Sequence, residues 1–209
     1  MKLIHSITYS VAQPLERGSN HYYSIMQGMV IRMTNIWHSI CPSRVAPVDF
    51  IAVIEIEKGS KKKYELDKET GHIILDRILY TSTHYPANYG FIPRTYADDG
   101  DPLDVLVLCS EILIPLSLVR CFPIGVITMQ DQEKMDEKII AIPFDDPTYS
   151  VYKDVSELPV HIFDEMKHFF SVYKNLERKT TAVDDIQGFE KAIQIIRYCL
   201  DAYVEKFCR

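Results

Sequence analysis

The chain has 209 residues, of which 47% are apolar and 25% charged, and its formal net charge is −6. These proportions exclude a wholly disordered chain, and the length is typical of one domain with at most an appendage. The negative charge argues against a nonspecific nucleic-acid binder, which would need a basic surface. No stretch approaches 18 apolar residues without a charge, so we expect no membrane-spanning helix.

Two features bear on location and domain organisation. The five cysteines are odd in number and form no CxxC pair, which indicates a reducing compartment, and we expect a cytoplasmic protein. The first 40 residues contain three basic residues against one acidic residue, Glu16, as organellar transit peptides often do. We favour a surface arm over residues 1–45, packed on the domain or on a neighbouring subunit, followed by a single domain over residues 46–209.

Strand patterns begin after the arm. Residues 50–57 alternate between an apolar stripe and a second face that ends in Glu55 and Glu57. Residues 62–66 and 73–79 flank turn residues and predict a hairpin. Further apolar runs predict strands at Val105–Leu108, Leu118–Ile127 and Ile139–Ile142. A small antiparallel barrel or sandwich would close these strands.

The period changes to that of a helix in the last third of the chain. Apolar side chains recur at helical spacing over residues 162–173, after Pro159, and again over residues 189–203. Strands followed by helices, without β-α-β alternation, predict the α+β class.

Several familiar sites are missing from the sequence. The eight glycines include no G-x-G pair and no P-loop, and there is no G-x-S-x-G motif. The seven histidines form no H-E-x-x-H motif, so a dedicated zinc site is not expected. Nucleotide binding by these routes and a serine nucleophile elbow are therefore excluded.

The segment Asp98–Asp104 places four carboxylates within seven residues, immediately before a predicted strand. Carboxylates this close repel one another unless they are solvated or share cations. A solvated turn and a metal site are equally compatible with the segment taken alone, since Asp-Gly and Asp-Pro are turn dipeptides. An EF-hand loop counted from Asp99 fails, because it needs glycine at Asp104 and glutamate at Ser110.

Other polar residues give this segment a chemical context, although each alone is typical of a solvated surface. A polar loop over residues 131–138 lies between two predicted strands, and the segment 84–94 carries two tyrosines four positions apart. Charged side chains also occupy strand positions, at Glu55, Lys63, Glu65 and Arg77. Together the set supplies carboxylates for Mg²⁺ and cations for phosphate oxygens, which a phosphoryl-transfer site must bring together.

Asp99–Val105 matches the D-x-D-P-x-D-V signature of the family I soluble inorganic pyrophosphatases, and residues 50–174 resemble this family. Further matching segments, in the family's order and spacing, are Val53–Ile56, Lys63–Glu65, Asp76–Arg77, Tyr85–Gly90 and Tyr173–Lys174. The segments Glu57–Ser60 and Asp145–Pro147 are most similar to the plant-type branch. The resemblance implies a small closed antiparallel OB-like β-barrel of five strands, flanked by C-terminal helices, and makes residues 46–209 the catalytic domain.

The resemblance also implies a role for each matching residue. The Mg²⁺ ligands would be Asp99, Asp101, Asp104, Asp131 and Asp136, with Glu55 and Glu65 holding further metal or water. The phosphate-binding groups would be Lys63, Arg77, Lys138, Tyr89, Tyr173 and Lys174, with Tyr85 at the rim of the site. Asp101 would accept a proton, and Tyr89 and Arg77 would assist catalysis. No functional position of the family pattern is altered.

The implied activity is Mg²⁺-dependent hydrolysis of pyrophosphate to two phosphates by direct attack of a metal-activated water, with several Mg²⁺ ions in each site. Pyrophosphate and phosphate would be the ligands, without nucleic acid or membrane, and the arm leaves a homo-oligomer open. A nucleic-acid-binding OB module is a second hypothesis, but it predicts basic residues where this chain has an acidic segment. A metal-stabilised structural protein is a third, and it has no need of Lys63, Arg77 and Lys174.

Overall fold

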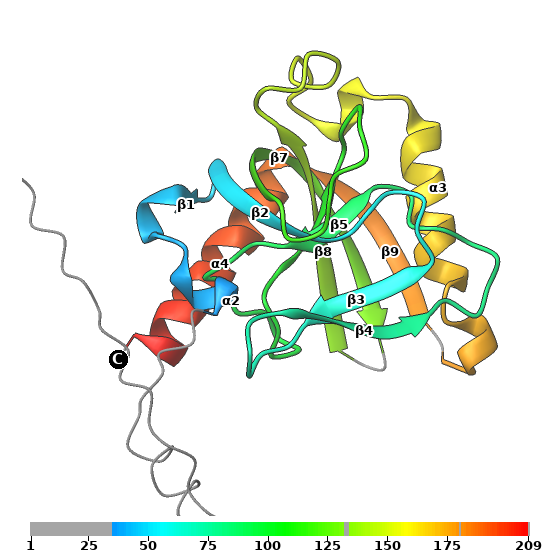
Figure 1. Cartoon of the computed structure of the whole chain (residues 1–209). Helices are drawn as coiled ribbons and strands as arrows, with labels where there is room; N and C mark the ends of the chain where they lie inside the picture. The colour runs from blue at the N-terminus through cyan, green and yellow to red at the C-terminus, as the bar shows by residue number, and fades with distance from the viewer. Residues whose placement is uncertain (1–34, 132–133, 180, 209) are drawn as a thin grey trace, which may run out of the picture. The chain divides into compact units, whose positions relative to one another are not determined.

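Figure 1 shows the computed structural model, which describes residues 35–131, 134–179 and 181–208. Residues 1–34, which form most of the expected arm, lie outside the described residues, so the arm stays a prediction. The described residues belong to one compact unit. None of the described helices is long and apolar enough to cross a membrane.

Five strands close into a ring. They are β2 (Asp49–Ile56), β5 (Asn88–Phe91), β6 (Asp104–Val107), β8 (Lys134–Pro143) and β7 (Leu118–Asp131). The sheet order runs β2-β5-β6-β8-β7, and a pairing of β2 with β7 completes the circle. The short strand β1 (Val45–Ala46) and the strand β9 (Thr181–Gly188) extend the sheet on either side. The expected OB-like α+β fold is therefore confirmed.

One pairing of the ring differs from the expected antiparallel arrangement, because β6 and β8 run parallel. The chain leaves β6, passes through residues 108–117 and forms all of β7 before it turns back into β8, so β8 returns in the direction of β6. This register places Asp104 directly opposite Lys138. The parallel pair thus brings a carboxylate and an amine from distant parts of the sequence together.

Gly90 marks a point where the ring is very tight. It lies in β5 opposite Ile54 of β2 and Val105 of β6. A Cβ atom built on Gly90 would lie 1.8 Å from the carbonyl oxygen of Val53, which is backbone and cannot move aside. Only glycine allows the two strands to approach this closely. The register shifts directly after this pair, so that the neighbouring Tyr89 lies opposite Ile56.

The predicted hairpin forms a separate two-stranded sheet from β3 (Lys62–Leu66) and β4 (Ile73–Ile78). Its turn ends at Gly71, whose φ of 74° is the left-handed conformation that favours glycine. Register pairs Lys63 with Arg77. Two cations from the two strands are thereby placed side by side.

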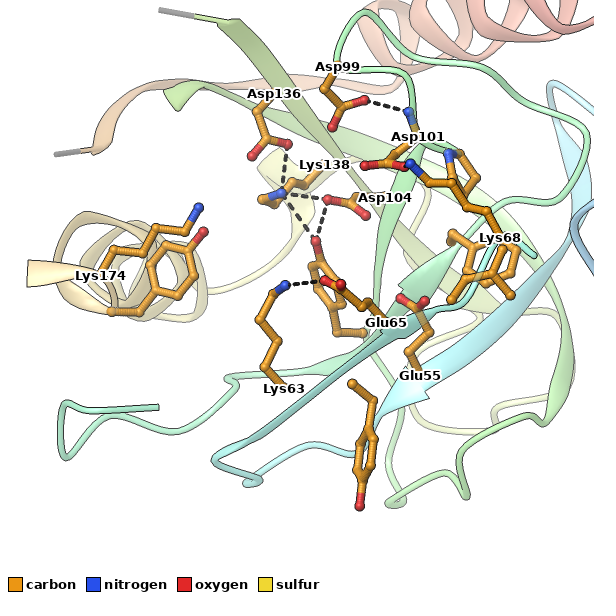
Figure 2. Close-up of a pocket in the computed structure, with 16 residues that line it drawn as sticks. Glu55, Lys63, Glu65, Lys68, Asp99, Asp101, Asp104, Asp136, Lys138 and Lys174 are labelled. Atoms are coloured by element: carbon orange, nitrogen blue, oxygen red, sulfur yellow. Dashed lines mark hydrogen bonds and ion pairs between the residues drawn. The ribbon is translucent and has the colours of Figure 1, made fainter. Parts of the chain in front are cut away.

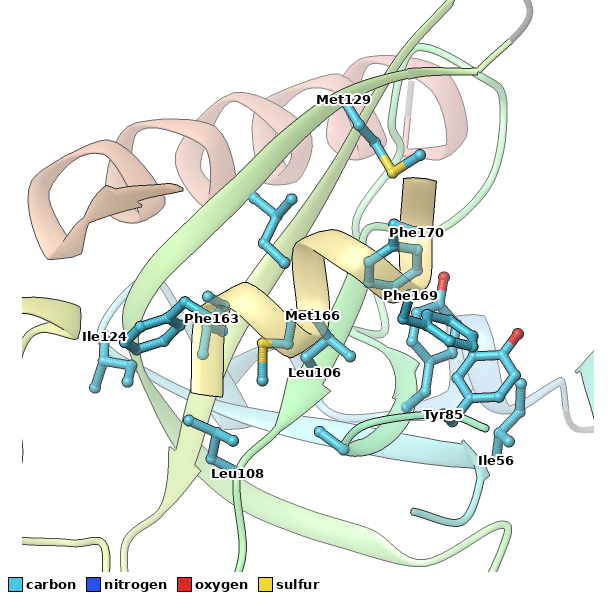
Figure 3. Packing of buried hydrophobic residues seen from close by; sticks show 14 of the residues in the cluster. Ile56, Tyr85, Leu106, Leu108, Ile124, Met129, Phe163, Met166, Phe169 and Phe170 are labelled. Atoms are coloured by element: carbon cyan, nitrogen blue, oxygen red, sulfur yellow. The ribbon is translucent and has the colours of Figure 1, made fainter. Parts of the chain in front are cut away.

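Two long helices cover the ring on different sides (Figure 1). The helix α3 (Val160–Val172) buries Phe163, Met166, Phe169 and Phe170 against ring residues that include Leu106 and Met129 (Figure 3). The helix α4 (Phe189–Phe207) packs into a second cluster through Ala192, Ile196 and Cys199. Both helices match the predicted apolar periodicity. Short 3₁₀ turns occur at η2 (Val155–Glu157) and η3 (Asn175–Glu177), and the latter follows α3.

The short helix α2 (Ile36–Ser39) and the turn η1 (Pro42–Arg44) begin the described chain. Asn35 caps α2 by accepting a hydrogen bond from the Trp37 backbone N–H at 2.9 Å. Trp37 is buried, packs with Phe91 and Tyr203, and donates from its indole Nε1 to the Thr95 carbonyl at 2.9 Å. The residues just before position 46 therefore belong to the packed body.

Three strands were not predicted, the short β1 at the end of the expected arm and two others, and one predicted loop is mostly strand. The segment 84–94, which is unusual for a strand because of its prolines, contains β5, and the polar segment 181–188 forms β9. The polar residues 131–138 continue β7 and β8 as far as Asp131 and Lys134. Asp136 and Lys138 therefore lie within a strand and have fixed directions.

Candidate active site

A cleft of about 250 Å³ lies between the hairpin β3–β4, the ring and the end of α3. Figure 2 shows the charged and phenolic side chains that line it. Those at predicted site positions are Glu55, Lys63, Glu65, Tyr89, Asp99, Asp101, Asp104, Asp136, Lys138, Tyr173 and Lys174. Acidic and basic groups thus share one cavity.

The loop before β6 fixes the first two carboxylates. Gly100 adopts a φ of 92°, and its N–H donates to the Ala97 carbonyl at 3.0 Å, while the Ala97 N–H donates to the Asp101 carbonyl at 2.8 Å. The Asp101 N–H donates to Asp99 Oδ1 at 3.0 Å. This compact turn holds Asp99 and Asp101 beside Asp104, the first residue of β6.

Lys138 lies at the centre of the acidic group and is only 2% exposed. Its Nζ donates to Asp104 Oδ2 and to Asp136 Oδ1, each at 2.7 Å, and to the Tyr89 hydroxyl at 3.2 Å (Figure 2). The Tyr89 hydroxyl also donates to Asp104. Burial alone lowers the pKa of Lys138, but Asp104 and Asp136 outweigh it and hold that pKa well above its usual value. The lysine is therefore a fixed positive charge.

Negative charge exceeds what this lysine neutralises. Burial, followed by the charges of Asp104, Asp101 and Asp136, raises the pKa of Asp99 to about 6. Burial and the Asp104 charge likewise raise the pKa of Glu55 well above its usual value. These shifts mean that an added cation would be bound favourably, because it would relieve the mutual repulsion.

The hairpin contributes a second group of cations. Lys63 Nζ donates to Glu65 Oε2 at 2.7 Å and to Asp76 Oδ2 at 2.8 Å. Arg77 shares Asp76 as an ion-pair partner, and its Nε donates to Glu177 Oε1 of η3 at 2.8 Å. Arg77 Nη2 is buried and has no hydrogen-bond partner among the described residues. Arg77 thus keeps one donor that no described residue uses.

The end of α3 supplies the remaining polar groups. Tyr173 and Lys174 follow the last residue of the helix, and both side chains are buried. Lys174 Nζ lies 5.1 Å from the centre of the Tyr173 ring, a cation–π distance. The phenol and the ammonium thus reach the cleft from the side opposite the loop of Asp99 and Asp101 (Figure 2).

Comparison with known proteins identifies the family. Residues 52–204 match the family model "Inorganic pyrophosphatase". The chain is 49% identical over 171 residues to soluble inorganic pyrophosphatase 2 of Chlamydomonas reinhardtii. This match covers 82% of this chain and 89% of the relative. The chain belongs to the inorganic pyrophosphatase family. It is therefore an inorganic diphosphatase, which hydrolyses pyrophosphate.

Further relatives agree with this assignment. Soluble inorganic pyrophosphatase 1 of Arabidopsis thaliana is 49% identical over 169 residues, covering 81% of this chain and 80% of the relative. The solved inorganic pyrophosphatase of Thermus thermophilus superposes with a TM-score of 0.78 at 36% identity, covering 81% of this chain and 99% of that one. The inorganic pyrophosphatase structure from Helicobacter pylori superposes with a TM-score of 0.73 at 46% identity, and the match covers 75% of this chain and 94% of that one. The similarity to plant and algal pyrophosphatases confirms the plant-type resemblance.

Not every predicted site residue of the pyrophosphatase lines the cleft. Arg77 stands beside it, next to Lys63 and Asp76. Tyr85 is buried in the core, where its ring lies 5.3 Å from that of Tyr89, so it supports the site from behind. The side chain of Asp131 lies outside the described residues.

The pyrophosphatase also has site residues that the sequence analysis did not single out. Lys68, in the hairpin turn, lines the cleft and forms an ion pair with Asp101. Glu177 anchors Arg77 from 100 positions away in the sequence. A charged residue in a turn carries no periodic signal, so neither partner could be found before the elements were folded together.

The acidic group suits a hard divalent cation in its chemistry. Mg²⁺ prefers carboxylate oxygens in a polar site, and here several carboxylates meet with raised pKa values. Within the described part of the chain, no three His, Cys, Asp or Glu side chains are already arranged to hold a metal ion. Lys138 and Lys68 instead neutralise these carboxylates. The carboxylates suit Mg²⁺ in their chemistry. To bind the cation, however, they would have to give up a contact with a lysine.

Proposed function

We propose that this diphosphatase uses several Mg²⁺ ions per site and that Asp101 accepts the proton of the attacking water. The observation that carries the proposal is the meeting of carboxylates and phosphate-type cations in one cleft, next to an Arg77 Nη2 for which the described residues offer no hydrogen-bond partner. A structural metal site would not need these cations. A nucleic-acid module would not concentrate carboxylates in its groove.

Asp99, Asp101, Asp104 and Asp136 are the residues we propose to hold the cations, together with Asp131, while Glu55 and Glu65 would hold further metal or water. Bound Mg²⁺ would lower the pKa of water and neutralise phosphate oxygens. Asp101 is proposed as the base because it lines the cleft and because its ion-pair partner among the described residues is the exposed Lys68 ammonium. A carboxylate oxygen in this state can accept a proton once that ammonium moves.

Phosphate oxygens would be bound by the cations around the acidic group. Lys63 and Arg77 approach from the hairpin, Lys138 from the ring, and Tyr173 and Lys174 from the end of α3. The Tyr89 hydroxyl would donate to a phosphate oxygen after leaving Asp104. Positive charge on several sides would stabilise the negative charge that develops as the bridging bond breaks. Tyr85 would keep the Tyr89 ring in place rather than contact the substrate.

A phosphate-release assay tests this function. Purified protein with pyrophosphate and Mg²⁺ should release two phosphates per substrate molecule, and activity should fall to background when EDTA is added in excess and return with added Mg²⁺. Undiminished turnover in EDTA would contradict the metal-dependent mechanism. A metal-stabilised structural protein would bind Mg²⁺ without releasing phosphate.

Arg77→Ala tests the phosphate-binding role. Loss of charge-assisted hydrogen bonds should weaken phosphate binding roughly 10- to 100-fold. Arg120→Ala is the matched control, because Arg120 forms a bidentate pair with Asp49 on the exposed surface and does not line the cleft. Calorimetric titration with phosphate measures both, and equal affinities for the two variants would remove Arg77 from the substrate site.

We propose the cytoplasm as the location, since all five cysteines are free thiols. Pyrophosphate and phosphate are the proposed ligands, and neither nucleic acid nor a membrane takes part. Assembly into a homo-oligomer stays a prediction of the sequence.

A further inference from the structure

A lysine without an assigned role already neutralises Asp101. The Lys68 ammonium forms an ion pair with Asp101 Oδ1, and Figure 2 shows the two side chains meeting beside the acidic loop. This oxygen is buried and has no geometrically sound hydrogen bond to the described residues. The Asp101 side chain as a whole is 45% exposed, so Lys68 is the charge that covers this one oxygen before any other cation is present.

The backbone of Lys68 is fixed, although its side chain is not. Asn35 Nδ2 donates to the Lys68 carbonyl at 2.8 Å, and the Gly71 N–H donates to the Asp67 carbonyl at 2.8 Å across the turn. The Lys68 side chain is 52% exposed. Rotation about its own bonds can therefore move the ammonium into solvent while the hairpin turn stays in place.

Lys68 and a divalent cation would compete for the same oxygen. Two positive charges beside one carboxylate repel each other, so the ammonium must leave when the cation binds. Lys138 differs in this respect, because it is buried between Asp104 and Asp136 and cannot reach solvent by rotation alone. Lys138 therefore stays in the site as a permanent charge, whereas the Lys68 ammonium can be exchanged for a cation.

We propose that Lys68 is a positioning residue that holds Asp101 in the cation-free enzyme and is displaced by Mg²⁺, so that it sets the Mg²⁺ concentration at which the acidic loop fills. The inference rests on the proposed function, since it assumes that Asp101 meets Mg²⁺. Lys68 neutralises Asp101 before a cation binds, and it weakens cation binding because it competes for the same carboxylate.

Titration calorimetry with Mg²⁺, at constant ionic strength and without substrate, tests the proposal. Lys68→Met removes the competing charge and keeps the chain length, so Mg²⁺ should bind roughly three- to tenfold more tightly than to the wild type. Lys68→Arg keeps the charge and should restore the wild-type affinity. Lys62→Met is the matched control, because Lys62 lies on the same hairpin but pairs with Glu57 outside the cleft.

Thermal unfolding provides a second readout that a merely structural lysine would not produce. Lys68→Met should unfold at a lower temperature than wild type in EDTA, and the two should unfold alike in saturating Mg²⁺. Equal or weaker Mg²⁺ affinity for Lys68→Met would overturn the assignment of Lys68. If the wild type hydrolysed pyrophosphate but gave no more heat of Mg²⁺ binding than a control in excess EDTA, the proposed metal mechanism would be wrong. The Lys68 inference, which rests on it, would then be wrong as well.

Discussion

Replacing Asp101 by asparagine is expected to lower kcat by roughly 10²–10⁴-fold, the usual consequence of removing a general base. Asparagine keeps the shape and one carbonyl oxygen, and the Asp101 backbone N–H can still donate to Asp99. The loop should therefore fold as before and still bind at least one Mg²⁺ ion. Steady-state rates measured over a wide range of Mg²⁺ concentrations give kcat and the Mg²⁺ requirement separately.

Asp104→Asn is the informative comparison for this variant. Asp104 accepts hydrogen bonds from the buried Lys138 and from Tyr89, which places it among the groups that arrange the site, whereas Asp101 is paired with the exposed Lys68 ammonium. This variant should raise the Mg²⁺ concentration for half-maximal activity and leave kcat at saturation closer to that of the wild type. A near-wild-type kcat for Asp101→Asn in saturating Mg²⁺ would rule out Asp101 as the base.

Lys138→Met should produce the largest loss of stability. The substitution leaves Asp104 and Asp136 facing each other without their shared cation, and breaking a buried pair in this way costs about 3–5 kcal/mol. For a body of this size, the melting temperature in EDTA should fall by about 6–20 °C. Mg²⁺ should restore part of the loss, since it would neutralise the same carboxylates.

Calorimetry or circular dichroism with and without Mg²⁺ measures this difference. Lys62→Met serves again as the control, because an exposed pair such as Lys62–Glu57 contributes about 0–1 kcal/mol. Turnover of Lys138→Met should remain low even where Mg²⁺ restores folding, because a phosphate-binding charge is gone. A variant as stable as wild type in EDTA would mean that the two carboxylates take up protons and tolerate the loss.

The sequence could predict elements whose stability depends on a regular apolar pattern. The stripe of Phe163, Met166 and Phe170 predicts α3, because a helix that buries one face must repeat its apolar residues every three to four positions. The strand β2 is predicted for the same reason, with period two. The strands β5 and β9 were missed, because prolines interrupt one neighbourhood and polar residues dominate the other.

The candidate site was predictable where a short motif contains the chemistry. Asp99, Asp101 and Asp104 are close in sequence, and they meet in one cleft with Lys138 as the resemblance implies. Contacts that depend on distant elements were not predictable. Glu177 reaches Arg77 only because η3 follows α3 past the hairpin, and such a contact leaves no pattern in a single sequence.

Gly90 has a consequence for how freely this sequence can vary. It has no functional group and does not line the cleft, yet any side chain there would collide with the Val53 carbonyl and separate β5 from β2. Since Tyr89 is the next residue and contacts both Lys138 and Asp104, a separation of these strands would also displace the centre of the site. In a library of random variants, this position would tolerate change as poorly as the acidic loop, for a geometric reason and not a chemical one.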